Sequence, residues 1–292
     1  MPFDPGFVTT LERLNLLARR VYAGDARGDR ESLRKGASLE FADYRAYTPG
    51  DDLRYVDWNA YARFGHLYVK EYAAEENVHA AIVLDTSASM TFGEPSKLET
   101  GRRVAAALGY IGLANLDSVS LYGVSDAARE AVRFLRGKQR IFELLDALDR
   151  VPTGGATSLR RALESPLPRL KGRAMALLLS DFFDPDGYEA PLRALRAQEI
   201  QVHALHLVAD EELAPRGRGR HRLTDLETGR TRDVFLSEAT LARYRRAFEA
   251  HCGGLEKFCA ANEMPYVRIQ TGWDLEKIVT EIVRRGGVLG YR

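Results

Sequence analysis

The chain has 292 residues, of which 45% are hydrophobic and 28% charged, and this globular composition excludes an intrinsically disordered protein. Its 42 Lys and Arg nearly balance its 41 Asp and Glu, so there is no general basic field for binding nucleic acid. No apolar run is long enough to cross a bilayer, and the N-terminus lacks the apolar core of a signal peptide. We therefore expect a cytoplasmic protein with no nucleic-acid partner and no membrane anchor of its own.

The chain begins with an amphipathic helical pattern in which Leu11 and Leu14 share a face with later apolar residues. Residues 25–75 are then polar and aromatic, with Tyr, Trp and Phe interleaved with Asp and Arg. For most of these residues we expect ring packing and ion pairs within a compact subdomain. Because Trp and Arg are enriched at interface hot spots, the segment also offers candidate interface residues, namely Arg54, Trp58 and Arg63. We assign residues 1–77 to this N-terminal segment.

After residue 78, apolar runs alternate with helical patterns, which is typical of a mostly parallel sheet with crossover helices. The expected strands are 78–84, 118–124, 130–135, 173–180 and 201–208, and the expected helices are 97–116, 139–151 and 188–198. The first helix has an Ala- and Gly-rich face that would pack closely on the sheet. The sequence thus predicts an α/β domain over residues 78–292, with a Rossmann-like core at 78–210.

The C-terminal third adds smaller elements to this core. Residues 215–236 have a basic Gly-rich start and the turn signal "ETGR", which predicts a β-hairpin insertion. Two helices with a strand at 267–270 between them end the chain. Cys252 and Cys259 fit neither a disulfide framework nor a zinc site, so we expect reduced thiols on one helix.

Two of the predicted strands end in acids, Asp85 and Asp181. In an alternating α/β sheet, ligands gather at the carboxyl ends of the strands. Ser87 and Ser89 follow the first acid at alternate positions, and the loop "GGATSL" between the two strands contributes Thr157. Carboxylate and hydroxyl oxygens are the donors that a hard cation such as Mg²⁺ or Mn²⁺ needs. The D-x-S-x-S string alone favours a capped turn. A second apolar strand that also ends in an acid, with the Thr-containing loop between the two strands, favours a metal site.

The order of these pieces resembles the von Willebrand factor A-type (vWA) domain and its metal-ion-dependent adhesion site (MIDAS), over about residues 78–210. In that family the first strand ends in D-x-S-x-S, and a later Thr and a later Asp complete the site. The resemblance implies that the metal ligands are Asp85, Ser87, Ser89, Thr157 and Asp181. The family often has Gly after the last Asp, whereas this chain reads "SDFFD", so Asp184 competes with Asp181 for that role.

The segment "LEFADYRAYTPGDDLRYVDWNAYARFGHLYVKEY", residues 39–72, resembles the signature of the bacterial DUF58 (domain of unknown function 58) family, which carries a vWA domain directly downstream. Members commonly occur beside MoxR-type AAA+ ATPases. The resemblance therefore implies an adaptor or assembly factor for such an ATPase.

Two classes of function remain open on the sequence. The first is a non-enzymatic module whose bound Mg²⁺ or Mn²⁺ accepts an acidic residue of a partner protein. The alternative is a metal-dependent phosphohydrolase or nuclease that uses Asp85 and Asp181. Ser87 stands where an Asp-x-Asp phosphatase motif would place its second acid, and the chain has no Walker loop for nucleotide hydrolysis. We therefore expect the binding module.

Overall fold

The computed structural model describes residues 6–25, 40–73, 78–164, 174–215 and 217–286. The chain divides into two compact units, in which residues 1–29 and 77–292 form unit 1 and residues 30–76 form unit 2. This division differs from the predicted boundary at residue 77, because helix α1 (Phe7–Asp25) belongs to unit 1. Leu11 and Leu14 on its apolar face are fully buried, in the same core cluster as residues of the sheet. An amphipathic pattern shows that one face is buried, but not which element covers it.

A six-stranded sheet forms the centre of unit 1. In order across the sheet its strands are β10 (Tyr266–Gln270), β7 (Gln201–Val208), β6 (Ala174–Ser180), β3 (His79–Asp85), β4 (Ser118–Val124) and β5 (Ala128–Leu135). Neighbouring strands are parallel except β5, which pairs antiparallel with β4 because only three residues connect the two strands. The predicted fold class, a mostly parallel Rossmann-like sheet flanked by helices, is confirmed.

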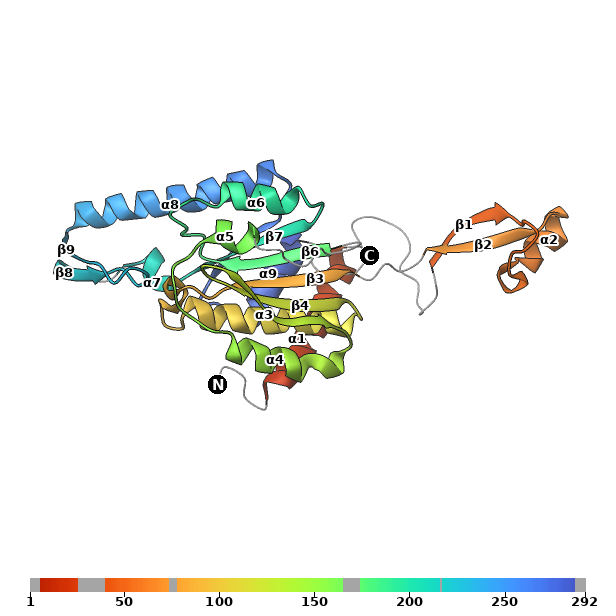
Figure 1. Ribbon diagram of the computed structural model, residues 1–292, viewed down its shortest axis with the longest axis horizontal. Coiled ribbons are helices and arrows are strands. Elements are labelled where there is room, and N and C mark those ends of the chain that lie inside the picture. The colour runs from red at the N-terminus through yellow and green to blue at the C-terminus, as the bar shows by residue number, and fades with distance from the viewer. Residues whose placement is uncertain (1–5, 26–39, 74–77, 165–173, 216, 287–292) are drawn as a thin grey trace. The chain divides into compact units, whose positions relative to one another are not determined.

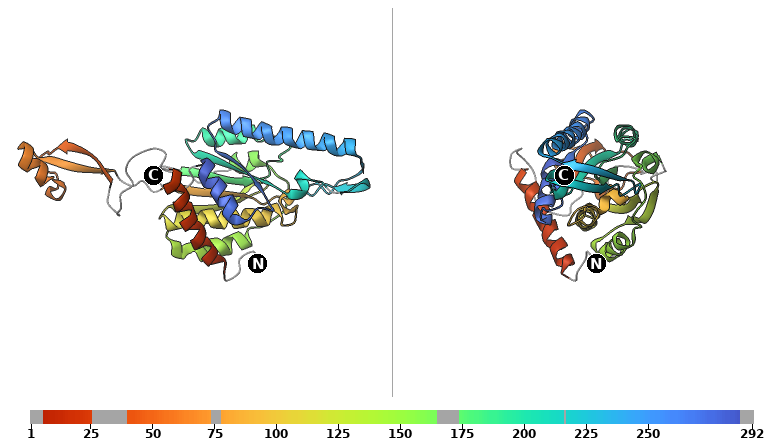
Figure 2. Two further views of the ribbon diagram at one scale, coloured as in Figure 1. Left: turned by 180° about the vertical axis from the view of Figure 1, so that it is seen from behind. Right: turned by 90° about the vertical axis from the view of Figure 1, so that its left-hand side faces the viewer.

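Helices cover both faces of this sheet (Figures 1 and 2). One face carries α1, α3 (Lys97–Ala114), α4 (Ile141–Arg150) and α9 (Leu275–Gly286), and the other carries α5 (Leu159–Glu164), α6 (Glu189–Arg196) and α8 (Glu238–Ala261). Because the sheet is covered twice, all seven residues of β3 and of β6 are buried, and each strand reads as a continuous apolar run.

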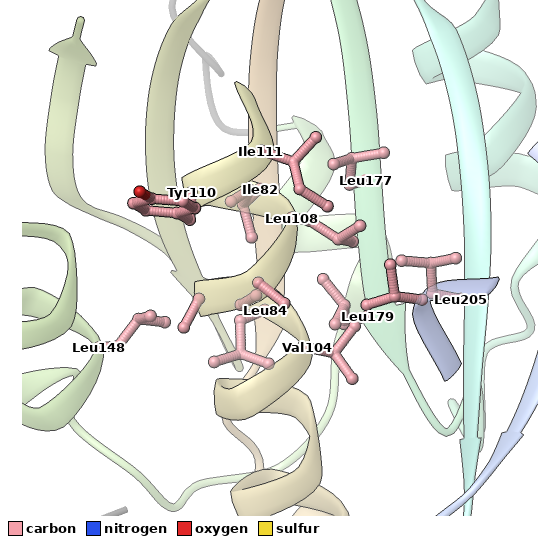
Figure 3. Packing of buried hydrophobic residues seen from close by; sticks show 14 of the residues in the cluster. Ile82, Leu84, Val104, Leu108, Tyr110, Ile111, Leu148, Leu177, Leu179 and Leu205 are labelled. Carbon is pink, nitrogen blue, oxygen red and sulfur yellow. The ribbon is translucent and has the colours of Figure 1, made fainter. Parts of the chain in front are cut away.

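The core beneath α3 shows how closely these layers pack (Figure 3). Ile82 and Leu84 of β3 lie against α3 side chains such as Leu108. The predicted close packing of the Ala- and Gly-rich helix face is confirmed at Gly109, where a Cβ atom would come 3.2 Å from Ile82 Cδ1 and 2.3 Å from Leu144 Cδ2. A larger residue at this position would collide with Leu144 of α4 and would crowd Ile82 of the sheet.

Shorter elements complete unit 1. The predicted hairpin is present as β8 (Gly219–Thr224) and β9 (Thr231–Leu236), paired antiparallel. Helix α7 (Asp210–Leu213) precedes it, and the 3-10 turns η2 (Ala88–Thr91) and η3 (Lys138–Arg140) follow β3 and β5. Both cysteines are free and buried on α8, as predicted. No helix in the described part of the chain has the length and apolar character that a bilayer span requires.

Unit 2 consists of the antiparallel strands β1 (Glu40–Ala46) and β2 (Tyr68–Ala73), the turn η1 (Leu53–Tyr55) and the helix α2 (Trp58–Phe64). Asp57 caps α2 by accepting hydrogen bonds from two backbone N–H groups of its first turn, and it also accepts one from the Tyr44 hydroxyl at 2.6 Å. Arg45 binds Asp51 through two nitrogens, at 2.6 and 2.7 Å. The expected network of rings, acids and arginines is thus present in this unit.

Candidate functional site

The direction of chain winding changes between β3 and β6. From β3 the chain continues to β4 on one side of the sheet, whereas from β6 it continues to β7 on the other side. In open α/β sheets, this switch point is where a crevice opens at the carboxyl ends of the strands. Asp85 is the last residue of β3, and Asp181 directly follows β6. The topology therefore places the two strand-end acids beside each other at the expected binding position.

Asp85 is fully buried and is held by two neutral donors. Its Oδ1 accepts a hydrogen bond from the Ser87 N–H at 3.0 Å, and its Oδ2 accepts one from the Ser180 hydroxyl at 2.6 Å. Burial, together with the nearby charge of Asp181, raises the pKa of Asp85 to about 7. A cation bound at this carboxylate would relieve both of these costs.

The two serines of the D-x-S-x-S string converge beside this carboxylate. Ser87 is buried and Ser89 is half-buried, and their hydroxyl oxygens lie 3.0 Å apart. Ser87 occupies the N-cap position of the turn η2, yet its hydroxyl does not bond to the backbone of that turn. The capped-turn interpretation of this string therefore does not account for the Ser87 side chain.

Asp181 is also fully buried, and it forms an ion pair with a lysine. Lys97 Nζ lies 2.7 Å from Asp181 Oδ2 and 2.6 Å from Glu212 Oε1, and the lysine is only 1% exposed. Burial opposes the charge of Lys97, but the two carboxylates outweigh it and raise the pKa of the amine. The other oxygen of Asp181 accepts a hydrogen bond from the Phe183 N–H at 3.1 Å. One of the two strand-end charges is therefore balanced by the protein itself.

Lys97 and Glu212 were not among the residues expected at the site. A signal for Lys97 exists in the sequence, because it is the first residue of α3, directly after the cap Ser96. The positive end of a helix dipole disfavours a lysine there, so the position calls for a nearby anion. Nothing local marks Glu212 as the second anion, since it lies 115 residues further along the chain.

Thr157 is buried on the Gly-rich loop beside the serine turn. The loop is fixed there by two backbone bonds, from the Gly154 N–H to the Thr86 oxygen at 2.8 Å and from the Ala88 N–H to the Gly155 oxygen at 3.0 Å. Both glycines have positive φ, at 115° and 85°, which explains why the loop needs them. The Thr157 hydroxyl donates a hydrogen bond of 2.5 Å to Glu227 Oε1, in the turn of the hairpin.

Asp184, the alternative to Asp181, has another role. Its Oδ2 accepts a hydrogen bond from the Leu159 N–H at 2.7 Å, at the start of α5, and its Oδ1 accepts one from the Asp186 N–H at 2.8 Å. These bonds hold a helix end and a turn, as short acids commonly do. Asp181 is therefore the acid at the switch point.

The oxygen donors at the switch point are of the chemical kind that a hard divalent cation takes. The described residues contain no group of three or more His, Cys, Asp or Glu that could hold a metal, so a site here depends on hydroxyl ligands. The Asp85 carboxyl accepts hydrogen bonds from Ser180 and Ser87, all of them from neutral donors, and its two oxygens offer about four lone-pair positions in total. Carboxylate and hydroxyl donors suit Mg²⁺ or Mn²⁺.

The three candidate interface residues lie in unit 2. Arg54 pairs with Asp52 at 2.6 Å and leaves 84% of its side chain exposed, and Trp58 is 58% exposed. Arg63 is also exposed, in the last turn of α2. Exposed Trp and Arg side chains are available to a partner.

Comparison with known proteins identifies one matching family and several similar chains. A family described as "Protein of unknown function DUF58" matches residues 43–253. The uncharacterized protein Rv1480 of Mycobacterium tuberculosis is 27% identical over 297 residues, covering 99% of this chain and 93% of its own. Among solved structures, an aerotolerance-related membrane protein from Bacteroides fragilis has a TM-score of 0.45 at 19% identity, over 71% of this chain and 97% of that one. The conserved hypothetical protein BatB from Bacteroides thetaiotaomicron has a TM-score of 0.41 at 16% identity, over 72% of this chain and 100% of that one.

Proposed function

Since this chain belongs to the DUF58 family, whose function is unknown, we propose from its own site that it is a metal-dependent protein-binding module. In this proposal Mg²⁺ or Mn²⁺ is held by Asp85, Ser87, Ser89 and Thr157, with Asp181 beside them. A carboxylate of a partner protein completes the coordination of the ion. The bound cation supplies a position that attracts an acidic side chain.

The observation that carries this proposal is the unequal balance of charge at the switch point. Lys97 neutralises Asp181, whereas the donors to Asp85 are a backbone N–H and a hydroxyl. Both acids are fully buried, and a buried carboxylate is costly unless it is paired with a cation. A divalent ion at Asp85 would supply that charge, and an open coordination position on the ion would accept the carboxylate of an acidic partner.

The partner that we propose is a MoxR-type AAA+ ATPase, with this chain as its adaptor or assembly factor in the cytoplasm. This part of the proposal rests on the resemblance of residues 39–72 to the DUF58 signature. An acidic surface residue of the ATPase would be the ligand. No role in nucleic-acid binding is proposed, since the net charge of the chain is only +1.

The enzyme alternative, a phosphohydrolase or nuclease that uses Asp85 and Asp181, is less well supported by the geometry. Both oxygens of each acid accept hydrogen bonds from the protein, and both acids are fully buried. This enzyme would need both acids for the metal or the substrate, whereas Asp181 is already paired with Lys97. Phosphate release from p-nitrophenyl phosphate with added Mn²⁺, if lost in Asp85→Asn, would decide for the enzyme.

Calorimetric titration with Mn²⁺ tests the metal site. Asp85→Asn keeps the size of the side chain but removes its charge and replaces one acceptor oxygen with an NH2 donor, toward which the Ser180 hydroxyl can turn its oxygen. We expect Mn²⁺ binding to be lost while the fold survives. Asp117→Asn is the matched control, because Asp117 is also buried, at 4% exposure, but directly precedes β4 at the opposite edge of the sheet. Equal Mn²⁺ affinity in wild type and Asp85→Asn would refute the site.

A further inference from the structure

The hairpin turn directs one acid at the candidate site. Glu227 Oε1 accepts the hydrogen bond from Thr157, although 70 residues separate the two along the chain. Glu227 is half-buried, while the residues on both sides of it, 222–226 and 228–233, are exposed. Within residues 222–233, Glu227 is thus the residue that is partly shielded from solvent, and it is the one that contacts Thr157.

The turn that presents Glu227 is well formed. Asp225 Oδ1 accepts hydrogen bonds from the N–H groups of Glu227 and Thr228, at 2.9 and 3.0 Å, and the backbone of Asp225 bonds with Arg230 and Gly229. These bonds from the backbone N–H groups lower the pKa of Asp225, so its side chain stays ionised as an acceptor. Gly229 has a φ of 68°, which glycine adopts without strain. The hydrogen bonds within the turn therefore fix the position of Glu227 independently of its contact with Thr157.

The rest of the hairpin is weakly attached to unit 1. None of the residues of β8 and β9 is buried, and apolar side chains such as Leu223 and Phe235 are 53% and 63% exposed. Lifting such an arm from the site exposes little apolar surface and so costs little free energy.

We infer that Thr157 marks the position where the acidic ligand binds, and that Glu227 occupies this position as a built-in substitute for the carboxylate of the partner. The inference rests on the proposed function and adds the place of the ligand and a means of control. A partner must displace Glu227 before its own acid can bind. If the hairpin is closed about 90% of the time, the apparent dissociation constant for an external carboxylate rises about tenfold.

Acetate is a suitable probe of this position, because it presents a carboxylate and nothing else. In protein saturated with Mn²⁺, acetate that reaches the ion has its methyl-proton relaxation accelerated by the paramagnetic metal. We expect Glu227→Gln to reach half of the maximal effect at about one tenth of the acetate concentration that wild type needs. Asp233→Asn is the matched control, since it removes a charge from the same hairpin at a residue that pairs with Arg222 and not with the site.

The outcomes separate the two proposals. If wild type binds Mn²⁺ but wild type and Glu227→Gln need the same acetate concentration for half of the maximal effect, the proposed role of Glu227 is wrong. The proposed metal module would still stand. Mn²⁺ that binds to neither protein overturns the metal module and the inference together. Faster amide hydrogen exchange at residues 224–231 in Glu227→Gln than in Asp233→Asn would support the release of the hairpin from Thr157.

Discussion

At the scale of single residues, Lys97 is almost fully buried and forms ion pairs with both Asp181 and Glu212. Removing one partner of a buried ion pair leaves the other charges unpaired. We therefore expect Lys97→Met to lower the free energy of unfolding by about 3–5 kcal/mol, measured by urea denaturation at pH 7.5.

Two further variants define this effect. Lys138→Met removes an exposed lysine and should change stability by less than about 0.5 kcal/mol. The double variant Lys97→Met with Asp181→Asn removes both charges of one pair, so it should be more stable than Lys97→Met alone. Losses that simply add in the double variant would show that Lys97 and Asp181 do not interact.

His203 gives the stability of unit 1 a dependence on pH. It is 1% exposed, neither of its ring nitrogens has a partner among the described residues, and burial lowers its pKa to about 4. The unfolded chain takes up this proton near pH 6.5, so the contribution of the neutral ring is full above that pH and is lost as the pH falls toward 4. We expect His203→Leu to reduce the loss of stability between pH 7.5 and pH 5 by about 2 kcal/mol.

Urea denaturation at both pH values measures this difference. His66→Gln, at an exposed imidazole, is the control and should leave the difference between the two pH values unchanged. His79 and His206 are also buried, with pKa values lowered mainly by burial to about 4 and about 3, so some acid sensitivity will remain. An unchanged pH difference in His203→Leu would show that its ring is protonated in the folded protein.

The candidate site was predictable from the sequence only where its pattern is local. Asp85, Ser87 and Ser89 lie within five residues, and the strand before Asp181 repeats the apolar run with an acid at its end. The hydrogen bonds and ion pairs around these residues join distant parts of the chain. Lys97 is 84 residues from Asp181 and 115 from Glu212, and Thr157 is 70 residues from Glu227. The hydrophobic periodicity of the sequence does not predict such contacts, because they form only when helices and strands pack together.

At the scale of whole elements, α1 is the part whose place differs from the expectation. Its side chains Leu11, Leu14 and Ala18 are buried, and the helix packs on α3 and α9, so it contributes to the core although the chain leaves unit 1 after it. Leu14→Ala should lower the free energy of unfolding by about 2–5 kcal/mol. Leu16→Ala, on the same helix but at a residue that is 56% exposed, should change it by less than about 0.5 kcal/mol.

Urea denaturation of the two variants compares a buried and an exposed leucine in one helix. Equal effects would mean that α1 does not pack on unit 1. The buried strands of the central sheet, by contrast, were predictable almost to the residue, because a sheet covered on both faces requires continuous apolar runs such as 79–85 and 174–180. Strands β1 and β2 of unit 2 were not predicted, since they have no such apolar runs. The partner of an amphipathic helix has no comparable signal in the sequence.

On the scale of the whole molecule, we propose that each of the two units offers one surface to the same partner. Unit 2 is inserted between α1 and β3. Its first and last described residues, Glu40 and Ala73, are paired in the two-stranded sheet. The strand-end site of unit 1 would bind an acid, while Trp58 of unit 2 presents an exposed aromatic ring. Binding through two joined surfaces is stronger than through either one alone.

This arrangement predicts that partner binding and metal binding can be separated by mutation. We expect Trp58→Ala to weaken retention of a MoxR-type ATPase in an affinity pull-down at least about tenfold, since a hot-spot tryptophan contributes about 2 kcal/mol or more. Its Mn²⁺ affinity should remain that of wild type, because the proposed metal ligands all lie in unit 1. Phe142→Ala, at a residue of α4 that is 66% exposed, is the control and should retain the ATPase fully. Asp85→Asn or a chelator should also weaken retention of the ATPase, because either one removes the metal from the strand-end site of unit 1. If Asp85→Asn and Trp58→Ala both retained the ATPase fully, the ATPase would bind neither the strand-end site nor the surface around Trp58.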